Sequence, residues 1–234
     1  MLFAGQLVVC AASADAQWLF AAYGGAAVTR PSDVQIEKPE TDTALRFDDT
    51  PFEGRSFDAP VYYGYRAGRM ISARHGLFVA AEFIHAKAYA TVTEVYGSGV
   101  LQGAPVHQVP MSGIVDRFAM SHGLNFLFAD IGIRRQLLPR LASTLIAGAG
   151  PMLPHVESEI DGLPREGYQL GGTGFQVAVG AEVRVSRHVS LLAEYKWTRA
   201  IMRVTIAGGE ASLSPMSHHG VVGVAVAIGG APGR

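Results

Sequence analysis

Apolar residues occupy every second position along the stretch 168–206, and this alternation limits the possible folds more than any other feature of the chain. Each odd-numbered residue from Phe175 to Val183 is apolar, and the pattern resumes from Leu191 to Trp197 after a short polar break. Side chains of a β-strand point alternately to two faces. The stretch therefore predicts two long strands joined by a tight turn, each with one apolar face.

The second face of these strands carries charge in its middle. The charged residues on that face are Glu182, Arg184, Glu194 and Lys196. The strands are also longer than the usual length of about five or six residues. A soluble sandwich would bury the apolar face and expose the polar one to water, whereas this combination favours a barrel with lipid outside and a polar interior.

Composition agrees with a membrane protein that has no spanning helix. Hydrophobic residues make up 49% of the chain and charged residues 17%. Past the N-terminus there is no run of about 18 apolar residues, so a spanning helix is not expected. An apolar chain without spanning helices can cross a bilayer only as a closed barrel. The net charge of −1 and the lack of a basic block argue against nucleic-acid binding.

The first 16 residues have the features of a secretory signal peptide. A short apolar segment precedes Ala14-Asp15-Ala16, which predicts cleavage before Gln17. Cleavage would remove Cys10, the chain's one cysteine, and leave an exported protein without disulfides. Residues 17–234 are then expected to form a single barrel domain.

Long and short connections alternate along the expected strands. The strands are predicted at 17–29, 56–71, 76–91, 117–136 and 142–157, as the two within 168–206, and at 216–229. Long solvated loops are expected at 30–55, 93–116, 158–167 and 207–215, with short turns between the other strands. Outer-membrane barrels have short periplasmic turns and longer outer loops. The sequence therefore predicts an all-β, eight-stranded antiparallel up-and-down transmembrane barrel.

Charged side chains are expected to fill the interior. A barrel of eight strands is just wide enough for its own side chains, so an open pore is not expected. Buried charges persist when they are paired, which predicts a mutually paired network. Its candidate members are Arg66, Glu82, Asp130, Arg134, Glu182, Arg184, Glu194 and Lys196.

Three histidines are expected at similar height on adjacent strands. His85, His122 and His155 lie near the outer ends of the third, fourth and fifth strands, and Glu157 and Asp33 lie at the same rim. Imidazole and carboxylate groups together could bind a divalent metal or act as acid and base. Strand alternation opposes this grouping: it sends His85 outward and His122 inward unless a bulge intervenes. The alternative is that these histidines simply meet lipid headgroups, and no sequence motif identifies a cofactor.

Several stretches resemble a known family of outer-membrane barrels. They are SDV at 32–34, GRSFDAPVYYG at 54–64, EFIHAKAYA at 82–90, HGLN at 122–125 and GAGPMLPHVE at 148–157. Together they resemble the lipid A oxidase family of rhizobia and their relatives, and the likeness spans most of the mature chain. The resemblance implies a Gram-negative outer-membrane enzyme that oxidises the proximal glucosamine of lipid A to an aminogluconate. It also implies that the reaction depends on oxygen and is assisted by a metal.

Three functional hypotheses follow. In the first, the barrel modifies lipid A, with His85, His122, His155 and Glu157 as catalytic residues. The same three histidines are the candidate metal ligands, and Lys87, Asn125 and Asp33 are the candidate substrate-binding residues. The expected partners are lipid A and the outer-membrane assembly machinery, and a monomer is expected. In the second hypothesis, a structural or adhesive barrel binds ligands with its acidic outer loops. In the third, a soluble lipocalin-like barrel turns its apolar face inward.

Overall fold

The computed structural model describes residues 17–229. The expected signal peptide, with Cys10, lies outside these residues, as does the tail at 230–234. The described chain is almost entirely β-strand, with two short 3-10 turns, η1 (Pro39–Thr41) and η2 (Met111–Gly113). No helix within residues 17–229 is long and apolar enough to cross a bilayer.

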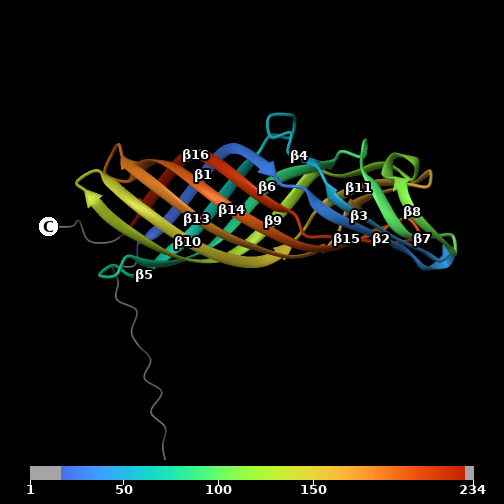
Figure 1. Cartoon of the computed structure of the whole chain (residues 1–234). Coiled ribbons are helices and arrows are strands. Elements are labelled where there is room, and N and C mark those ends of the chain that lie inside the picture. Colours follow the sequence, from blue (N-terminus) through green and yellow to red (C-terminus); the bar gives the residue numbers. More distant parts are fainter. Residues whose placement is uncertain (1–16, 230–234) are drawn as a thin grey trace, which may run out of the picture.

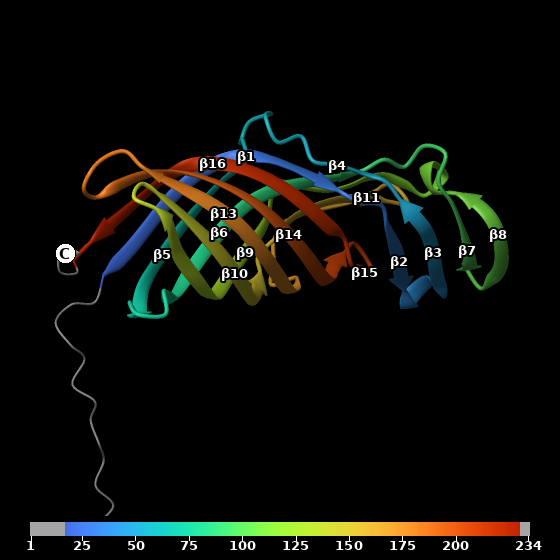
Figure 2. The same ribbon diagram turned by 60° about the vertical axis from the view of Figure 1, so that its left-hand side comes forward.

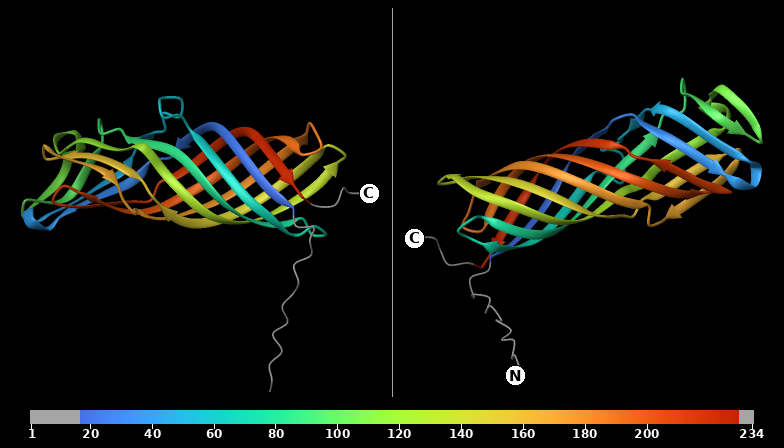
Figure 3. Two further views of the ribbon diagram at one scale, coloured as in Figure 1. Left: turned by 180° about the vertical axis from the view of Figure 1, so that it is seen from behind. Right: turned by 60° about the horizontal axis from the view of Figure 1, so that its bottom comes forward.

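Eight strands close into a ring (Figures 1 and 3). Each pairs antiparallel with the next, and the last pairs with the first, where Trp18 lies opposite Ile228. The ring confirms the predicted eight-stranded up-and-down barrel. Its members are β1 (Trp18–Thr29), β5 (Tyr63–Ser72), β6 (Leu77–Ala90), β9 (Val115–Leu138), β10 (Leu141–Met152), β13 (Gly172–Arg184), β14 (Val189–Ile206) and β16 (Met216–Ile228).

Eight further strands extend the wall beyond one end of the ring, so the described sheet has sixteen strands. One side runs in the order β14-β15-β2-β3-β7-β8, and the other continues from β9 to β11 and β12 (Figure 2). The added strands are β2 (Ser32–Lys38), β3 (Thr43–Thr50), β4 (Phe52–Glu53), β7 (Tyr96–Leu101), β8 (Ala104–Pro110), β11 (His155–Ile160), β12 (Leu163–Tyr168) and β15 (Gly209–Leu213).

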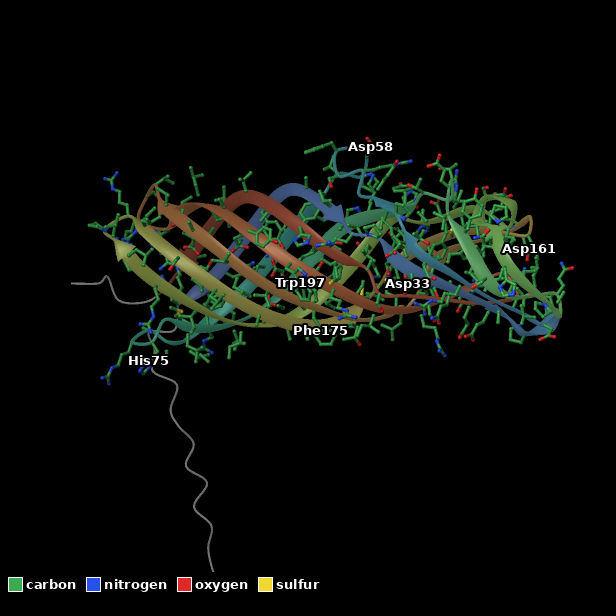
Figure 4. The ribbon with its side chains drawn as sticks, viewed as in Figure 1. Asp33, Asp58, His75, Asp161, Phe175 and Trp197 are labelled. Carbon is green, nitrogen blue, oxygen red and sulfur yellow. The ribbon has the colours of Figure 1, made fainter. Side chains whose placement is uncertain are left out.

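The prediction of four long loops is therefore wrong, because each of these four segments contains strands of the extension. Acidic residues suggested solvated loops, but in β2 and β3 they alternate with buried apolar residues. The expected strand 142–157 also divides between β10 and β11. The tip of the extension is cross-linked by an ion pair between Lys38 Nζ and Asp161 Oδ2, 2.6 Å apart (Figure 4).

The apolar face of the ring strands points outward. Val177, Val179, Leu191 and Tyr195 have exposed fractions between 48% and 54% in the isolated chain. A soluble lipocalin-like barrel would bury these side chains, so that hypothesis is wrong. Phe175 and Trp197 lie on the outer half of the ring (Figure 4), where aromatic side chains commonly meet the membrane interface. A closed ring with an apolar belt and a polar interior is the architecture of an outer-membrane β-barrel.

A network of paired charges fills the interior of the ring. The Arg66 guanidinium donates to both oxygens of Glu194 at 2.8 Å and to Glu82 at 2.9 Å. Lys196 Nζ lies 2.8 Å from Glu82 and 2.9 Å from Glu194. Gln176 bridges Glu82 and Asp130 at 2.6 and 2.7 Å. These contacts link β5, β6, β9, β13 and β14 across the interior of the ring.

Two further pairs lie toward the inner end of the ring. Arg134 donates to Glu182 at 2.8 Å, as part of the expected interior charge set. Arg184 does not join it: its side chain is exposed and contacts Gln136 at 3.4 Å. The reason is position, since Arg184 is the last residue of β13 and lies at the inner rim.

Between the charged network and the tip of the extension, the interior of the protein is apolar. The two walls of the extension face each other across a continuous hydrophobic core that includes Val34, Ile36, Leu45, Phe47, Met111, Phe118, Met152, Val156, Met202 and Val204. The outer part of the chain is thus a packed β-structure. This packing holds the strands that carry the candidate site in fixed positions.

Lys196→Met is expected to reduce the free energy of unfolding by roughly 3–5 kcal/mol, because it removes one of the two cations that neutralise the buried carboxylates and leaves excess negative charge beside Arg66. The side chain of Lys196 is fully buried between Glu82 and Glu194. Arg134→Gln is the matched control and should cost less than about 1 kcal/mol, since that pair is partly exposed. Urea unfolding of the reconstituted barrel measures both values. Equal losses in the two variants would contradict the account of the charged network.

Candidate functional site

His85 on β6 and Asn125 on β9 lie opposite each other in the strand register. Asn125 donates its amide N–H to the Leu153 carbonyl at 3.0 Å, so its Oδ1 is left to accept from His85 Nδ1 at 2.9 Å. This network assigns the proton of a neutral His85 ring to Nδ1 and leaves the lone pair on Nε2. Among residues 17–229, Nε2 has no hydrogen-bond partner although it is buried.

The segment 54–62 and the start of β5 cover His85 and Lys87. The Tyr63 ring stacks on His85 with centroids 4.8 Å apart and planes inclined by 16°. Lys87 is buried, and its ammonium donates to the Asp58 carbonyl at 2.9 Å. Asp58 lies on a loop that projects sideways from the wall (Figure 4). Lys87 therefore anchors this loop, and a lipid phosphate would reach it only if the loop moved.

A bulge in β9 turns His122 outward, so the inward facing expected from alternation is wrong. Ala86 pairs with Leu124 but Ala88 pairs with Met120, which places two extra residues in β9 between these pairs. Gly123 has φ of 130°, and a Cβ there would collide with the Asn125 side chain. Only glycine suits this conformation. The His122 side chain is 58% exposed on the outer wall.

β11 brings His155 and Glu157 next to His122. The His122 and His155 ring centroids lie 4.8 Å apart. Glu157 Oε1 lies 3.2 Å from His122 Nδ1. One ligand atom from each of the three residues can be chosen so that all lie within 4.8 Å of one another. His155 Nδ1 is buried without a hydrogen-bond partner in the described chain. The two histidines thus lie together as predicted, whereas Glu157 takes the place expected for His85.

Glu157 is held as a carboxylate. Burial raises its pKa, but hydrogen bonds from Ser121 and Arg117 and the charge of Arg117 outweigh burial and lower the pKa below the ordinary value. Arg117 Nη1 lies 3.0 Å from Oε2 of Glu157, and Ser121 donates to Oε1. The group is therefore an anion at neutral pH, as metal coordination requires.

His85 and His122 line a pocket of about 400 Å³ on the outward face, and His155 and Glu157 lie beside His122 outside its lining. Its lining is Pro60, Tyr63, Phe83, His85, His122, Asn125, Leu153 and Tyr168. The volume lies in the range typical of small-ligand sites. Sequence reasoning did not identify Tyr168, whose ring lies 4.7 Å from His155 and whose hydroxyl donates to the His122 carbonyl at 3.3 Å. The only available signal was an aromatic residue near a strand end.

Asp33 does not join this cluster, which corrects the expectation that it shares the rim. It lies on β2, which pairs with β3 and with β15, and β15 continues from β14 on the opposite side of the ring. Its carboxylate binds Arg46 and accepts the Asp49 N–H. β2 and β3 form a hairpin on that side, whereas the three histidines lie on β6, β9 and β11.

Solved structures of bacterial outer-membrane barrels resemble the chain at low identity. Neisserial surface protein A is 13% identical with a TM-score of 0.45, covering 90% of this chain and 97% of that chain. OprG from Pseudomonas aeruginosa is 8% identical with a TM-score of 0.48, covering 92% and 97%. The outer membrane protease OmpT from Escherichia coli is 8% identical with a TM-score of 0.42, covering 94% and 99%.

No protein-family model and no curated protein matches the chain. The likeness to the solved structures is loose. The fold follows from the chain's own strand register, which closes the ring.

The purified barrel is expected to bind one divalent metal ion at His122, His155 and Glu157. His155→Ala should weaken binding more than about tenfold, because loss of even an outer-shell partner commonly costs 10–100-fold. Titration with Co²⁺, followed by absorption and calorimetry, measures the affinity. His107→Ala is the matched control, since that exposed histidine lies on β8 away from the cluster. Identical affinities of the His155 variant and wild type would contradict the assignment.

Proposed function

We propose that this outer-membrane barrel oxidises lipid A at the pocket on its outer wall. The observation that carries the proposal is the grouping of His122, His155 and Glu157 within 4.8 Å beside a pocket on the lipid-facing side of the wall. A site on the outside of a barrel can receive a substrate that diffuses within the leaflet. Lipid A is such a substrate, and the resemblance in sequence points to the same molecule.

The donor set fits a redox metal. Two imidazoles and one carboxylate form the ligand set of non-haem iron oxygenases, which leave positions open for other ligands. His155 Nδ1 has no hydrogen-bond partner in the described chain. This nitrogen is therefore available as a metal ligand. Arg117 and Ser121 hold Glu157 in place, as outer-shell partners of metal ligands do. A bound iron ion would supply the means to activate O₂.

His85 is suited to act as a base beside this centre. Its Nδ1–H is held by Asn125, and that bond directs the basic lone pair to Nε2. Tyr63 stacks on the ring and restrains its orientation. Because Nε2 is buried under the segment 54–62, this segment would have to move aside before His85 could take the proton of the anomeric hydroxyl of the proximal glucosamine.

The reaction balances with O₂ as the electron acceptor. Oxidation breaks the anomeric C–H and O–H bonds and removes two electrons and two protons, which convert O₂ to hydrogen peroxide. The resulting lactone then adds water and opens to the aminogluconate. The net change is the gain of one oxygen atom, and the anomeric oxygen must carry no phosphate.

Lipid A from cells that express the wild-type barrel should contain a species heavier by one oxygen atom. His85→Ala should reduce that species by at least about 100-fold, in line with the usual contribution of a positioned general base, and His155→Ala should reduce it by at least about tenfold, because it removes a proposed metal ligand. Mass spectrometry of extracted lipid A measures the ratio, and His107→Ala serves as the control for expression and folding. Unmodified lipid A in wild-type cells grown with oxygen and iron would refute the proposed activity.

A non-enzymatic binding protein is the second candidate. Its support is the packed extension, which exposes Glu37, Glu40, Asp42 and Asp48 on a firm scaffold. Deleting the acidic segment 31–53 would remove core residues of β2 and β3, so substitution of exposed acids is the sharper test. Exchange of these four residues for Asn or Gln should abolish binding to cationic surfaces while lipid A stays unaltered. Unchanged binding would end this candidate.

A further inference from the structure

A second concavity lies on the outer wall, at the junction between the ring and its extension. It has a volume of about 1060 Å³ and is bordered by β13, β14, β15 and β2. None of the histidines discussed above lines it. We call this concavity the arginine groove, because Arg199 and Arg203 of β14 border it together.

Arg199 and Arg203 have few carboxylates close to them, unlike the other charged residues that border the groove. Both occupy exposed positions on the outward face of β14. Within residues 17–229, no carboxylate oxygen lies within 4 Å of Arg199, and Arg203 has only a long contact of 3.6 Å to Glu210. Asp33 and Asp49 border the far side, where Asp33 is bound to Arg46. The β14 side of the groove is therefore cationic.

Apolar side chains continue from the arginines toward the membrane belt. Arg199 lies opposite Phe175 in the strand register, and Trp197 is two residues closer to the membrane on the same face (Figure 4). Ile201 and Leu170 also line the groove, and their exposed fractions are 51% and 71%. Aromatic residues mark the headgroup level of a bilayer. The arginines thus lie where lipid phosphates are found.

We propose that the arginine groove binds a phosphate-bearing lipid of the outer leaflet. The guanidinium groups of Arg199 and Arg203 hold the phosphate, since their planar forks match its oxygens. An acyl chain lies along Phe175, Ile201 and Leu170. The proposal does not require catalysis at the histidine pocket.

The groove is close to the histidine pocket along the chain. Tyr168 lines the pocket and Leu170 lines the groove, so the segment between them is at most about 7 Å long. This short segment therefore connects the wall of the pocket to the wall of the groove. Binding in the groove is measurable without any modification of lipid.

Trp197 supplies a local reporter. The chain has two tryptophans, and Trp18 lies at the other end of the ring. A Trp18→Phe barrel in phosphatidylcholine nanodiscs is titrated with lipid A that carries one phosphate, and separately with fully dephosphorylated lipid A. Trp197 fluorescence gives the affinity, and native mass spectrometry gives the number of lipids retained.

The phosphorylated lipid should bind at least about tenfold more tightly than the dephosphorylated one, because charge-assisted hydrogen bonds to phosphate are lost in the latter. The double change Arg199→Gln and Arg203→Gln should remove this preference. Arg135→Gln, which removes an exposed arginine near the inner end of β9, should preserve it.

Three results would overturn the proposal. They are equal affinity for the two lipids, an unchanged preference in the double variant, and displacement of the lipid by millimolar inorganic phosphate. A difference in gel migration between heated and unheated samples verifies that each variant is folded. Arg199→Lys keeps the charge but not the fork, and it should give an intermediate affinity.

Discussion

The closed ladder of backbone hydrogen bonds is the constraint on which the rest of the structure depends. In lipid each backbone N–H and C=O must find a partner within the protein, and a ring of strands provides this without an edge. β16 returns to β1 over the whole of β1, from Trp18 to Thr29. Closure then separates the two faces of each strand, so that Val177 meets lipid while Gln176 meets the charged interior.

Closure also explains where chemistry can lie. The interior of the ring is filled by the network around Glu82, and the interior above it by packed apolar side chains. Polar groups that can meet a lipid are therefore confined to the outer wall near the rim. His122, His155 and Glu157 lie there, and the arginine groove lies at the same junction of ring and extension.

The eight ring strands could be predicted because apolar and polar residues alternate along them, as expected when one face meets lipid and the other the polar interior. The extension could not be predicted in the same way: β2 and β3 alternate too, but their acidic outward residues resemble those of a solvated loop. The interior pairs were foreseeable from charges in the middle of strands. Arg184 was the exception, because a strand end can leave the lumen.

The candidate site was predictable in its members more than in its arrangement. Topology placed His85, His122 and His155 on neighbouring strands, but the outward facing of His122 depends on the bulge at Gly123. A bulge depends on register between two strands, which local sequence does not contain. Tyr168 and the groove arginines depend in the same way on how the extension folds over the rim.

Spin labels on adjacent residues of β13 test the central claim, that lipid covers the apolar face and charge fills the interior. A label at position 177 in a bilayer should be relaxed strongly by O₂, which partitions into lipid, and weakly by a water-soluble nickel chelate. A label at 178 should be shielded from both reagents, because Ala178 is buried within the ring. Strong O₂ relaxation at 178 together with shielding at 177 would contradict the account.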